Sequence, residues 1–222
     1  MTDAPRTDAS TSGTSALSVD EQETAPTPIE GGDGRSLRRK RNRDAVITAL
    51  IELIQEGDLT PTVAKIADRA AVSHRSVFRY FDDLNDLART AIETEFRKAW
   101  PLSVIPNVGE GPLDARISAI VASSIRTFQR THKLGLVARS RAIDLEEVDR
   151  GLTTIYELRL DQIRRHFAPE LDQMDPQRAE TIAVAVTAVT GLDSFDVQHR
   201  MMGRDVDEVA EMWATTIHTL LT

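Results

Sequence analysis

The chain has 222 residues, of which 41% are hydrophobic, and its formal net charge at pH 7 is −8. It contains no cysteine, which excludes disulfides, thiolate metal ligands and cysteine nucleophiles. No apolar run approaches the roughly 20 residues that a helix needs to span a membrane, and the N-terminus lacks the basic and apolar regions of a signal peptide. We therefore expect a cytoplasmic protein with one or two packed domains and no membrane partner.

Charge is distributed unevenly along the chain. Residues 1–34 carry one basic and seven acidic residues, whereas residues 35–100 carry thirteen basic and ten acidic residues. DNA responds to the local field more than to the total charge, so an acidic chain can still bind it through a basic segment. Residues 1–35 are rich in Ser, Thr, Asp, Glu, Pro and Gly, which predicts a disordered tail because too little apolar surface is present to offset the entropy lost on ordering.

Helical spacing of apolar residues begins after this tail. The residues between Val46 and Ile54 form one apolar stripe, and Gly57 suits the end of that helix. A second, short helix is expected to begin with Thr60 at its N-cap and Pro61 at its first helical position. A basic cluster precedes and enters the first helix: Arg38, Arg39, Lys40, Arg41 and Arg43. Because cations near a helix N-terminus oppose its dipole, we favour DNA contact, along the backbone or in the minor groove, over a solvated helix start.

A tight turn joins the short helix to a third one, predicted from Ser73 to Phe81 with Ser73 as its N-cap. Two short helices joined in this way have the layout of a helix-turn-helix, whose second helix enters the major groove of DNA. Val77, Phe78 and Phe81 share an arc that we expect to face the core. The residues expected to face DNA are Ser73, His74, Arg75, Ser76, Arg79 and Tyr80. The alternative is an ordinary helical bundle with a solvated basic face.

The segment TVAKIADRAAVSHRSVFRYFDDLNDL, residues 62–87, resembles the DNA-binding segment of the tetracycline-repressor (TetR) family of transcriptional regulators. The positions that match the family pattern are Thr62, Ile66, Ala67, Ala70, Val72, Ser73, Ser76, Tyr80, Phe81 and Leu87. The resemblance implies base-edge contacts from residues 74–76 and phosphate contacts from Thr62 and Tyr80. Charge and position add Lys65 and Arg79 as phosphate contacts.

The segment departs from the family pattern at three positions. Ala71 stands where the family usually has Gly, so the turn either avoids a positive φ or accepts a small strain. Phe78 replaces a common Tyr and Leu84 a common Lys, which removes two side chains that often contact phosphate. A helical ligand-binding or scaffold protein without DNA binding therefore remains an alternative.

A fourth helix is predicted to end at Pro101, and the pattern beyond it stays helical. Further helices are predicted over about residues 113–128, 134–143, 148–163, 176–200 and 205–221. No segment shows strand alternation, so the predicted fold is all-α, with a helix-turn-helix domain over residues 36–83 and a helical domain over residues 84–222. The resemblance implies that the second domain senses a ligand and dimerises.

The last two predicted helices carry a long apolar stripe and many small residues, which let helices approach closely. Two such helices from each subunit would form a four-helix bundle, and the resembled family commonly dimerises in this way. The expected interface residues are Ile182, Val186, Val189, Val209, Trp213 and Ile217. The alternative is that the stripe closes the core of each subunit.

No pattern in the sequence predicts a cofactor, a metal site or catalytic residues. Asp193, Asp196 and His199 recur every three residues, but such steps drift around a helix, and a polar helix edge explains them better than a metal site. Arg159 could pair with an anionic ligand in a cavity, although a place on the surface is the simpler expectation. The sequence does not identify the ligand-binding residues.

These observations together predict a DNA-binding transcriptional regulator and not an enzyme. We expect it to bind a palindromic operator in double-stranded DNA as a homodimer. The resemblance further implies a repressor that responds to a small-molecule effector.

Overall fold

The structure, a computed structural model, describes residues 33–222. Most of the disordered tail predicted over residues 1–35 therefore lies outside the described residues. The first helix begins at Asp33, which assigns residues 33–35 to a helix and not to the tail. Every regular element within residues 33–222 is helical and none is a strand, which confirms the predicted all-α fold.

The helices follow one another through short connections. In chain order they are α1 (Asp33–Glu56), α2 (Val63–Arg69), α3 (His74–Tyr80), α4 (Leu84–Ser103), α5 (Leu113–Ala142), α6 (Glu146–His166), α7 (Ala168–Leu171), α8 (Pro176–Val189), α9 (Leu192–Phe195), the π-helix η1 (Asp196–Met201) and α10 (Val206–Leu221).

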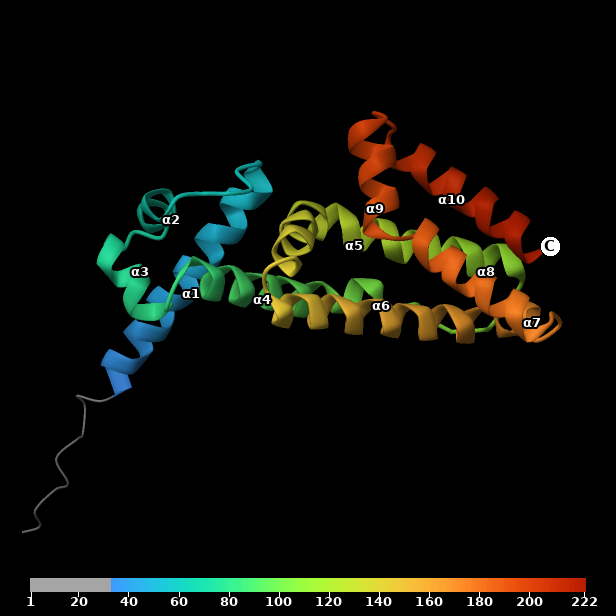
Figure 1. Ribbon diagram of the computed structural model, residues 1–222, viewed down its shortest axis with the longest axis horizontal. Helices are drawn as coiled ribbons and strands as arrows, with labels where there is room; N and C mark the ends of the chain where they lie inside the picture. The colour runs from blue at the N-terminus through green and yellow to red at the C-terminus, as the bar shows by residue number, and fades with distance from the viewer. Residues whose placement is uncertain (1–32) are drawn as a thin grey trace, which may run out of the picture.

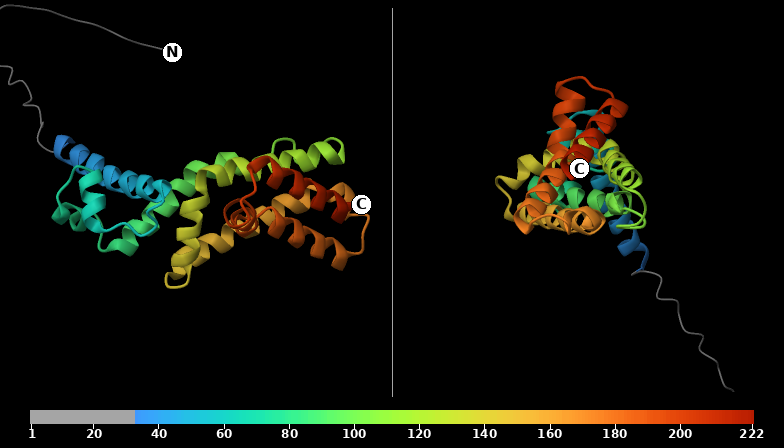
Figure 2. Two further views of the ribbon diagram at one scale, coloured as in Figure 1. Left: turned by 90° about the horizontal axis from the view of Figure 1, so that it is seen from above. Right: turned by 90° about the vertical axis from the view of Figure 1, so that its right-hand side faces the viewer.

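The molecule is elongated, with α1, α2 and α3 at one end (Figure 1). α4 runs from that end into the larger helical part, where it packs against α5. α8 and α10 pack together towards the other end, where the chain terminates (Figure 2). None of the helices described combines the length and the apolar character that crossing a bilayer requires.

Local sequence explains where α1 ends and α2 begins. α1 ends before Gly57, whose φ of 109° is one that glycine adopts without strain. The prediction that Thr60 caps α2 is wrong, because Thr62 is the N-cap and its Oγ1 accepts a hydrogen bond from the backbone N–H of Lys65. Pro61 is buried just before the helix instead of forming its first turn.

The turn between α2 and α3 contains a strained residue. Ala71 has a φ of 52°, in the left-handed region that favours glycine, so the turn accepts strain at this position. The backbone N–H of Val72 donates to the carbonyl of Ala67 at 3.0 Å and closes the turn. An alanine in this conformation costs on the order of 1 kcal/mol relative to glycine, which the packing of α2 against α3 must offset.

Two predicted helix ends are wrong, because each helix continues beyond the residue where it was expected to end. The helices predicted on either side of residues 129–133 are one 30-residue helix, α5. The polar residues between them find partners on other helices, since Arg130 pairs with Glu95 of α4 and His132 with Asp196 of η1. α4 likewise continues past Pro101 to Ser103.

The single helix predicted over residues 176–200 is also wrong. It breaks at Thr190 and Gly191 into α8, α9 and η1, and α9 turns away from α8 (Figure 1). Gly191 is the N-cap of α9, and a Cβ built on it would lie 3.1 Å from the carbonyl oxygen of Ala188. Glycine also costs about 1 kcal/mol in a helix interior, so this position favours the break.

Two apolar clusters hold the helices together. One lies at the α1–α3 end and includes Ile54, Ile66 and Phe81, but it extends into α5 and α6 through Leu134 and Leu152. The other surrounds α10 and joins it to α5, α6 and α8. The first cluster therefore connects the helix-turn-helix directly to helices of the larger part.

Candidate DNA-binding surface and internal cavity

The first turn of α3 is fixed by two serine side chains. The Oγ of Ser73 accepts a hydrogen bond from the backbone N–H of Ser76 at 3.2 Å, so Ser73 is the N-cap, as predicted. The hydroxyls of Ser73 and Ser76 lie 2.9 Å apart. Both serines thus stabilise the start of α3. Only the hydrogen bonds that their hydroxyls do not make within the helix are available to DNA.

Three cationic or ionisable side chains are exposed on α3: His74, Arg75 and Arg79. Within residues 33–222, the Arg75 guanidinium forms neither an ion pair nor a hydrogen bond. The Arg79 guanidinium donates to the Tyr80 hydroxyl at 2.8 Å and lies 5.1 Å from the centre of the Tyr80 ring. An unpaired guanidinium is the side chain best suited to bind a guanine edge by two hydrogen bonds.

The expectation that Phe78 faces the core is wrong. Val77 and Phe81 are buried, as predicted, but the Phe78 side chain is 47% exposed. Its ring lies 5.4 Å from the His74 ring, so the two form an exposed aromatic pair on α3. One helical step of 100° places Phe78 at the edge of the buried arc, where the neighbouring helices no longer cover it.

Tyr80 connects α3 to α1. It is partly buried, and its hydroxyl accepts hydrogen bonds from Asn42 of α1 at 3.3 Å and from Arg79 at 2.8 Å. Burial alone would raise the pKa of Tyr80, but these two hydrogen bonds and the positive charges of Arg79 and Arg39 lower it below its ordinary value. The hydroxyl therefore has a positioning role in the folded chain besides its predicted phosphate contact.

The two predicted contacts on α2 also have intramolecular partners. Thr62 is exposed and caps the helix, as described above. The ammonium of Lys65 lies 2.6 Å from the Asp58 carboxylate. A phosphate that binds Lys65 must therefore compete with Asp58, which weakens this contact relative to those of unpaired cations.

The basic cluster lies along α1 and not at its end. Because α1 begins at Asp33, the five cations occupy its second and third turns, and the helix-dipole argument loses most of its weight. Residues 38–41 are exposed. Arg43 is partly buried, with its guanidinium 4.8 Å from the centre of the Phe81 ring, so it also holds α1 against the end of α3.

The predicted dimer contacts fall in the core of the chain itself. Val186, Val209, Trp213 and Ile217 are fully buried, and Ile182 is 6% exposed. Val189 is partly buried against the same cluster. Five of the six predicted contacts therefore lie inside the core of the chain itself, which leaves them no exposed surface for the predicted interface. The reason is that the stripe of α10 meets α5 and α8 within one chain.

A different face of α8 is open. Thr181, Val184 and Ala188 are exposed and follow one another at helical spacing, and Val184 is 47% exposed. Thr181 also borders a shallow groove with Thr219 of α10. This face is made of small and apolar side chains, unlike the charged faces of α1 and α6.

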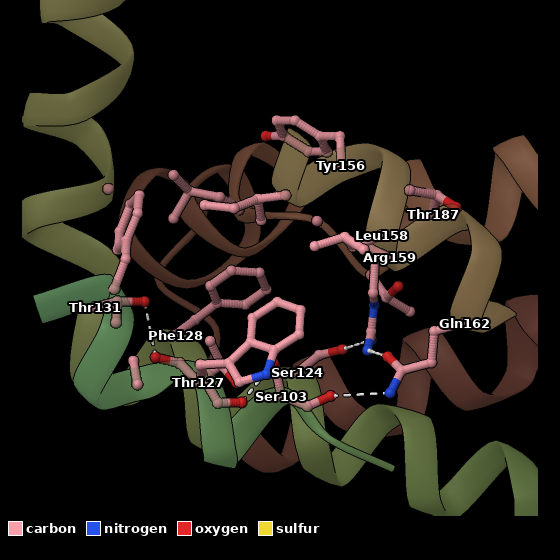
Figure 3. A pocket seen from close by; sticks show the side chains of 18 of the residues that line it. Ser103, Ser124, Thr127, Phe128, Thr131, Tyr156, Leu158, Arg159, Gln162 and Thr187 are labelled. Atoms are coloured by element: carbon pink, nitrogen blue, oxygen red, sulfur yellow. Dashed lines mark hydrogen bonds between the residues drawn. The ribbon is translucent and has the colours of Figure 1, made fainter. Parts of the chain in front are cut away.

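The larger part of the molecule encloses a cavity of about 220 Å³ between α4, α5, α6, α8 and α9. Its walls are mainly apolar and include Trp100. Figure 3 shows Phe128 among the side chains that line it. Trp100, Val104 and Leu158 line it and are each nearly half exposed, so they form an apolar rim at its opening.

Arg159 faces this cavity, and the expectation of a surface position is wrong. Its guanidinium donates to the Ser124 hydroxyl of α5 and to Oε1 of Gln162, the latter at 3.0 Å (Figure 3). In the part of the chain that is described, no carboxylate pairs with it. Burial lowers the pKa of Arg159 to about 10, so the side chain remains charged at neutral pH.

Sequence reasoning missed a buried ionic group where α5 meets η1. Asp196 is 7% exposed and accepts hydrogen bonds from Arg200 at 2.7 Å, and it lies 2.7 Å from Nε2 of His132. The hydrogen bonds from Arg200, with a smaller contribution from His132, hold the pKa of Asp196 below its usual value. The polar helix edge expected at this position therefore applies to the exposed Asp193 but not to Asp196. Only tertiary contact reveals this, because His132 and Asp196 are 64 residues apart.

The chain resembles solved structures in its fold but matches no known family in its sequence. No family model matches the sequence, and no curated protein matches it. The chain is similar to the solved structure of a transcriptional regulator from Rhodococcus sp. Rha1, with a TM-score of 0.64 and 16% sequence identity. The match covers 81% of this chain and 95% of the other. At this identity the similarity shows that the two chains share a fold.

Proposed function

We propose that this protein is a DNA-binding transcriptional regulator that binds its operator as a homodimer and responds to a small-molecule effector. The observation that carries the proposal is the outer surface of α3, a short capped helix that presents the unpaired Arg75 beside His74 and Arg79. Arginine and histidine on the second helix of a helix-turn-helix are suited to read base edges in the major groove. The shared fold with a structure described as a transcriptional regulator supports the proposal.

The basic cluster on α1 gives α3 a second electrostatic contact. Residues 38–41 are exposed on the helix to which Tyr80 and Arg43 attach α3. Lys and Arg in such a position neutralise phosphates and supply sequence-independent affinity. Base readers on α3 and phosphate contacts on α1 together account for both specificity and strength.

Dimerisation is proposed because one short recognition helix reads too few base pairs to find a site in a genome. A two-fold symmetric dimer places two recognition helices on the DNA and so doubles the number of base pairs that are read. Its interface uses the same surface on both subunits. The open face of α8, with Thr181, Val184 and Ala188, offers small and apolar side chains for a close helix crossing.

The cavity provides the route for effector control. It is lined by α4, which runs directly to the helix-turn-helix, and by α5 and α6, which share the apolar cluster of α1–α3. A ligand that binds one arrangement of these helices better than another would shift the spacing of the two α3 helices in the dimer.

DNA binding is tested with fluorescently labelled DNA from the region upstream of the gene, against a scrambled duplex of the same length. The variant Arg75→Glu on α3 is compared with Arg97→Glu, which makes the same charge change at an exposed position of α4. We expect Arg75→Glu to weaken upstream-DNA binding more than about tenfold and Arg97→Glu to change it little. Equal binding of both duplexes by the wild type, or equal loss in both variants, would contradict the proposal.

The dimer is tested with Ala188→Arg, and with Thr153→Arg on the exposed side of α6 as the control. Because Ala188 is exposed in the single chain, the change should leave the melting temperature nearly unchanged while light scattering reports a monomer. A dimer that persists with normal DNA binding would place the interface on another face.

A further inference from the structure

The cavity contains a positive charge that no carboxylate within residues 33–222 neutralises. Two cationic side chains, Arg159 and Arg165, line it, and no Asp or Glu does. Arg165 has its own partner, since its guanidinium lies 2.7 Å from the Asp161 carboxylate. Arg159 has only the neutral Ser124 and Gln162. Arg159 is partly buried. Withdrawing part of a guanidinium from water without a counterion is unfavourable, so an anion that enters the cavity would find an unneutralised partner there.

The polar groups that remain free in the cavity are mainly hydrogen-bond donors. The hydroxyls of Thr127, Thr131, Thr187 and Thr190 donate to carbonyls of their own helices. A guanidinium has five N–H groups, and Arg159 uses two of them. The strongest donors left for a ligand are therefore the N–H groups of Arg159, which match an acceptor-rich group such as a carboxylate.

The rest of the cavity limits what can carry that group. Its walls are mainly apolar, and its opening is bordered by Trp100, Val104 and Leu158. One unneutralised cation in such surroundings suits a monoanion, because a phosphate dianion would leave a charge and several acceptors without partners. The volume of about 220 Å³ lies below the roughly 300–1,000 Å³ of drug-sized sites, which favours a compact ligand.

We propose that this cavity binds a small amphipathic monocarboxylate, whose carboxylate pairs with Arg159 and whose apolar body lies against Phe128 and Trp100. The ligand supplies the missing counterion, and its hydrocarbon or aromatic part replaces water on the cavity wall. This inference rests on the proposed function only in naming the ligand as the effector, since the binding itself does not require DNA.

The experiment measures ligand binding by isothermal titration calorimetry on the full chain without DNA. The probes are two matched pairs, octanoate with 1-octanol and 4-phenylbutyrate with 4-phenyl-1-butanol, because each pair differs only in its head group. We expect at least one acid to bind the wild type ten times or more tightly than its alcohol. Arg159→Gln should abolish this preference and leave alcohol binding unchanged, whereas Arg165→Gln should preserve it.

A second variant locates the ligand. Thr127→Leu adds volume to the cavity wall and should weaken the acid and the alcohol alike. Circular-dichroism melts confirm that each variant is folded, and a fluorescence change from Trp100, at the rim, reports binding independently.

Three results would overturn the proposal: an alcohol that binds as tightly as its acid, an acid preference that survives Arg159→Gln, or no binding of either acid. If acids bind through Arg159 but do not alter DNA binding, the ligand class stands and effector control fails. If the chain binds no DNA but still selects acids, the regulator function fails and the ligand class stands.

Discussion

Helix α3 and the internal cavity each contain an arginine that has no carboxylate partner within residues 33–222. The surroundings of these two arginines differ. Arg75 is exposed on α3, where water and salt screen its charge. Arg159 faces a mainly apolar cavity, where burial lowers its pKa to about 10. An exposed unpaired cation costs little and can exchange partners rapidly, whereas an enclosed one favours a single complementary anion.

The same contrast extends to the aromatic residues. Phe78 is exposed on α3 beside His74, whereas Trp213 is fully buried and packs near Phe128 and Phe195. The α1–α3 end therefore places its distinctive side chains on the outside, and the larger part places them inside. Substitutions at the first end should change DNA binding, and substitutions at the second should change stability or ligand binding.

Removing the largest buried side chain should have the largest effect. Trp213→Ala should lower the free energy of unfolding by about 3–5 kcal/mol, because it leaves a cavity and removes the hydrogen bond from Nε1 to the Ser194 hydroxyl. Trp100→Ala, at a position that is 46% exposed, should cost much less. Urea denaturation of both variants measures the difference. A Trp213→Ala protein that kept its stability but became monomeric would show that this side chain contributes to a dimer interface.

The next effect concerns base selection at the opposite end. Arg75→Ala should leave the melting temperature unchanged and cost about 1–3 kcal/mol of discrimination at particular operator positions. Binding to a panel of single-base operator variants measures it. A uniform loss over the whole panel would show that Arg75 contacts phosphate instead.

The buried ionic group should give a smaller, pH-dependent effect. The pKa of Asp196 in the folded chain is lowered, chiefly by the hydrogen bonds from Arg200, so its contribution to stability is present above the unfolded pKa of about 3.9 and is lost as the pH falls through the folded value. Asp196→Asn should therefore melt about 2–4 °C lower than the wild type near pH 6, for a loss of about 1 kcal/mol. The two melting curves should converge in more acidic buffer. A constant difference from pH 6 to pH 3 would show that the charge of Asp196 does not contribute.

The smallest effect is expected from single residues of the basic cluster. Arg38→Ala should flatten the slope of log K against log salt by about one unit and reduce affinity equally for operator and scrambled DNA. Arg43→Ala is the informative comparison, because this side chain also packs on Phe81 and its loss should lower the melting temperature as well. Identical melting temperatures for the two variants would argue against a structural role for Arg43.

The sequence by itself determined the features that depend on neighbouring residues. Periodicity predicted an all-α chain, Ser73 was identified as the cap of α3, and Gly57 as the end of α1. These depend on local hydrogen bonds and backbone preferences, which residues within one or two helical turns fix. The charged outer face of α3 was predictable for the same reason, although Phe78 at its edge was not.

Only the tertiary structure decided which of two helical faces lies inside. The apolar stripe of α10 was compatible with a subunit interface or with a core, and packing against α5 and α8 buries Trp213 within one chain. The position of Arg159 in its helix predicts a surface residue, but the packing of α4, α5 and α6 places it in the wall of a cavity. The contact of His132 with Asp196 joins two residues whose relation no helical periodicity predicts. A helix's own sequence specifies that an apolar face must be covered, whereas the covering element is chosen by long-range packing.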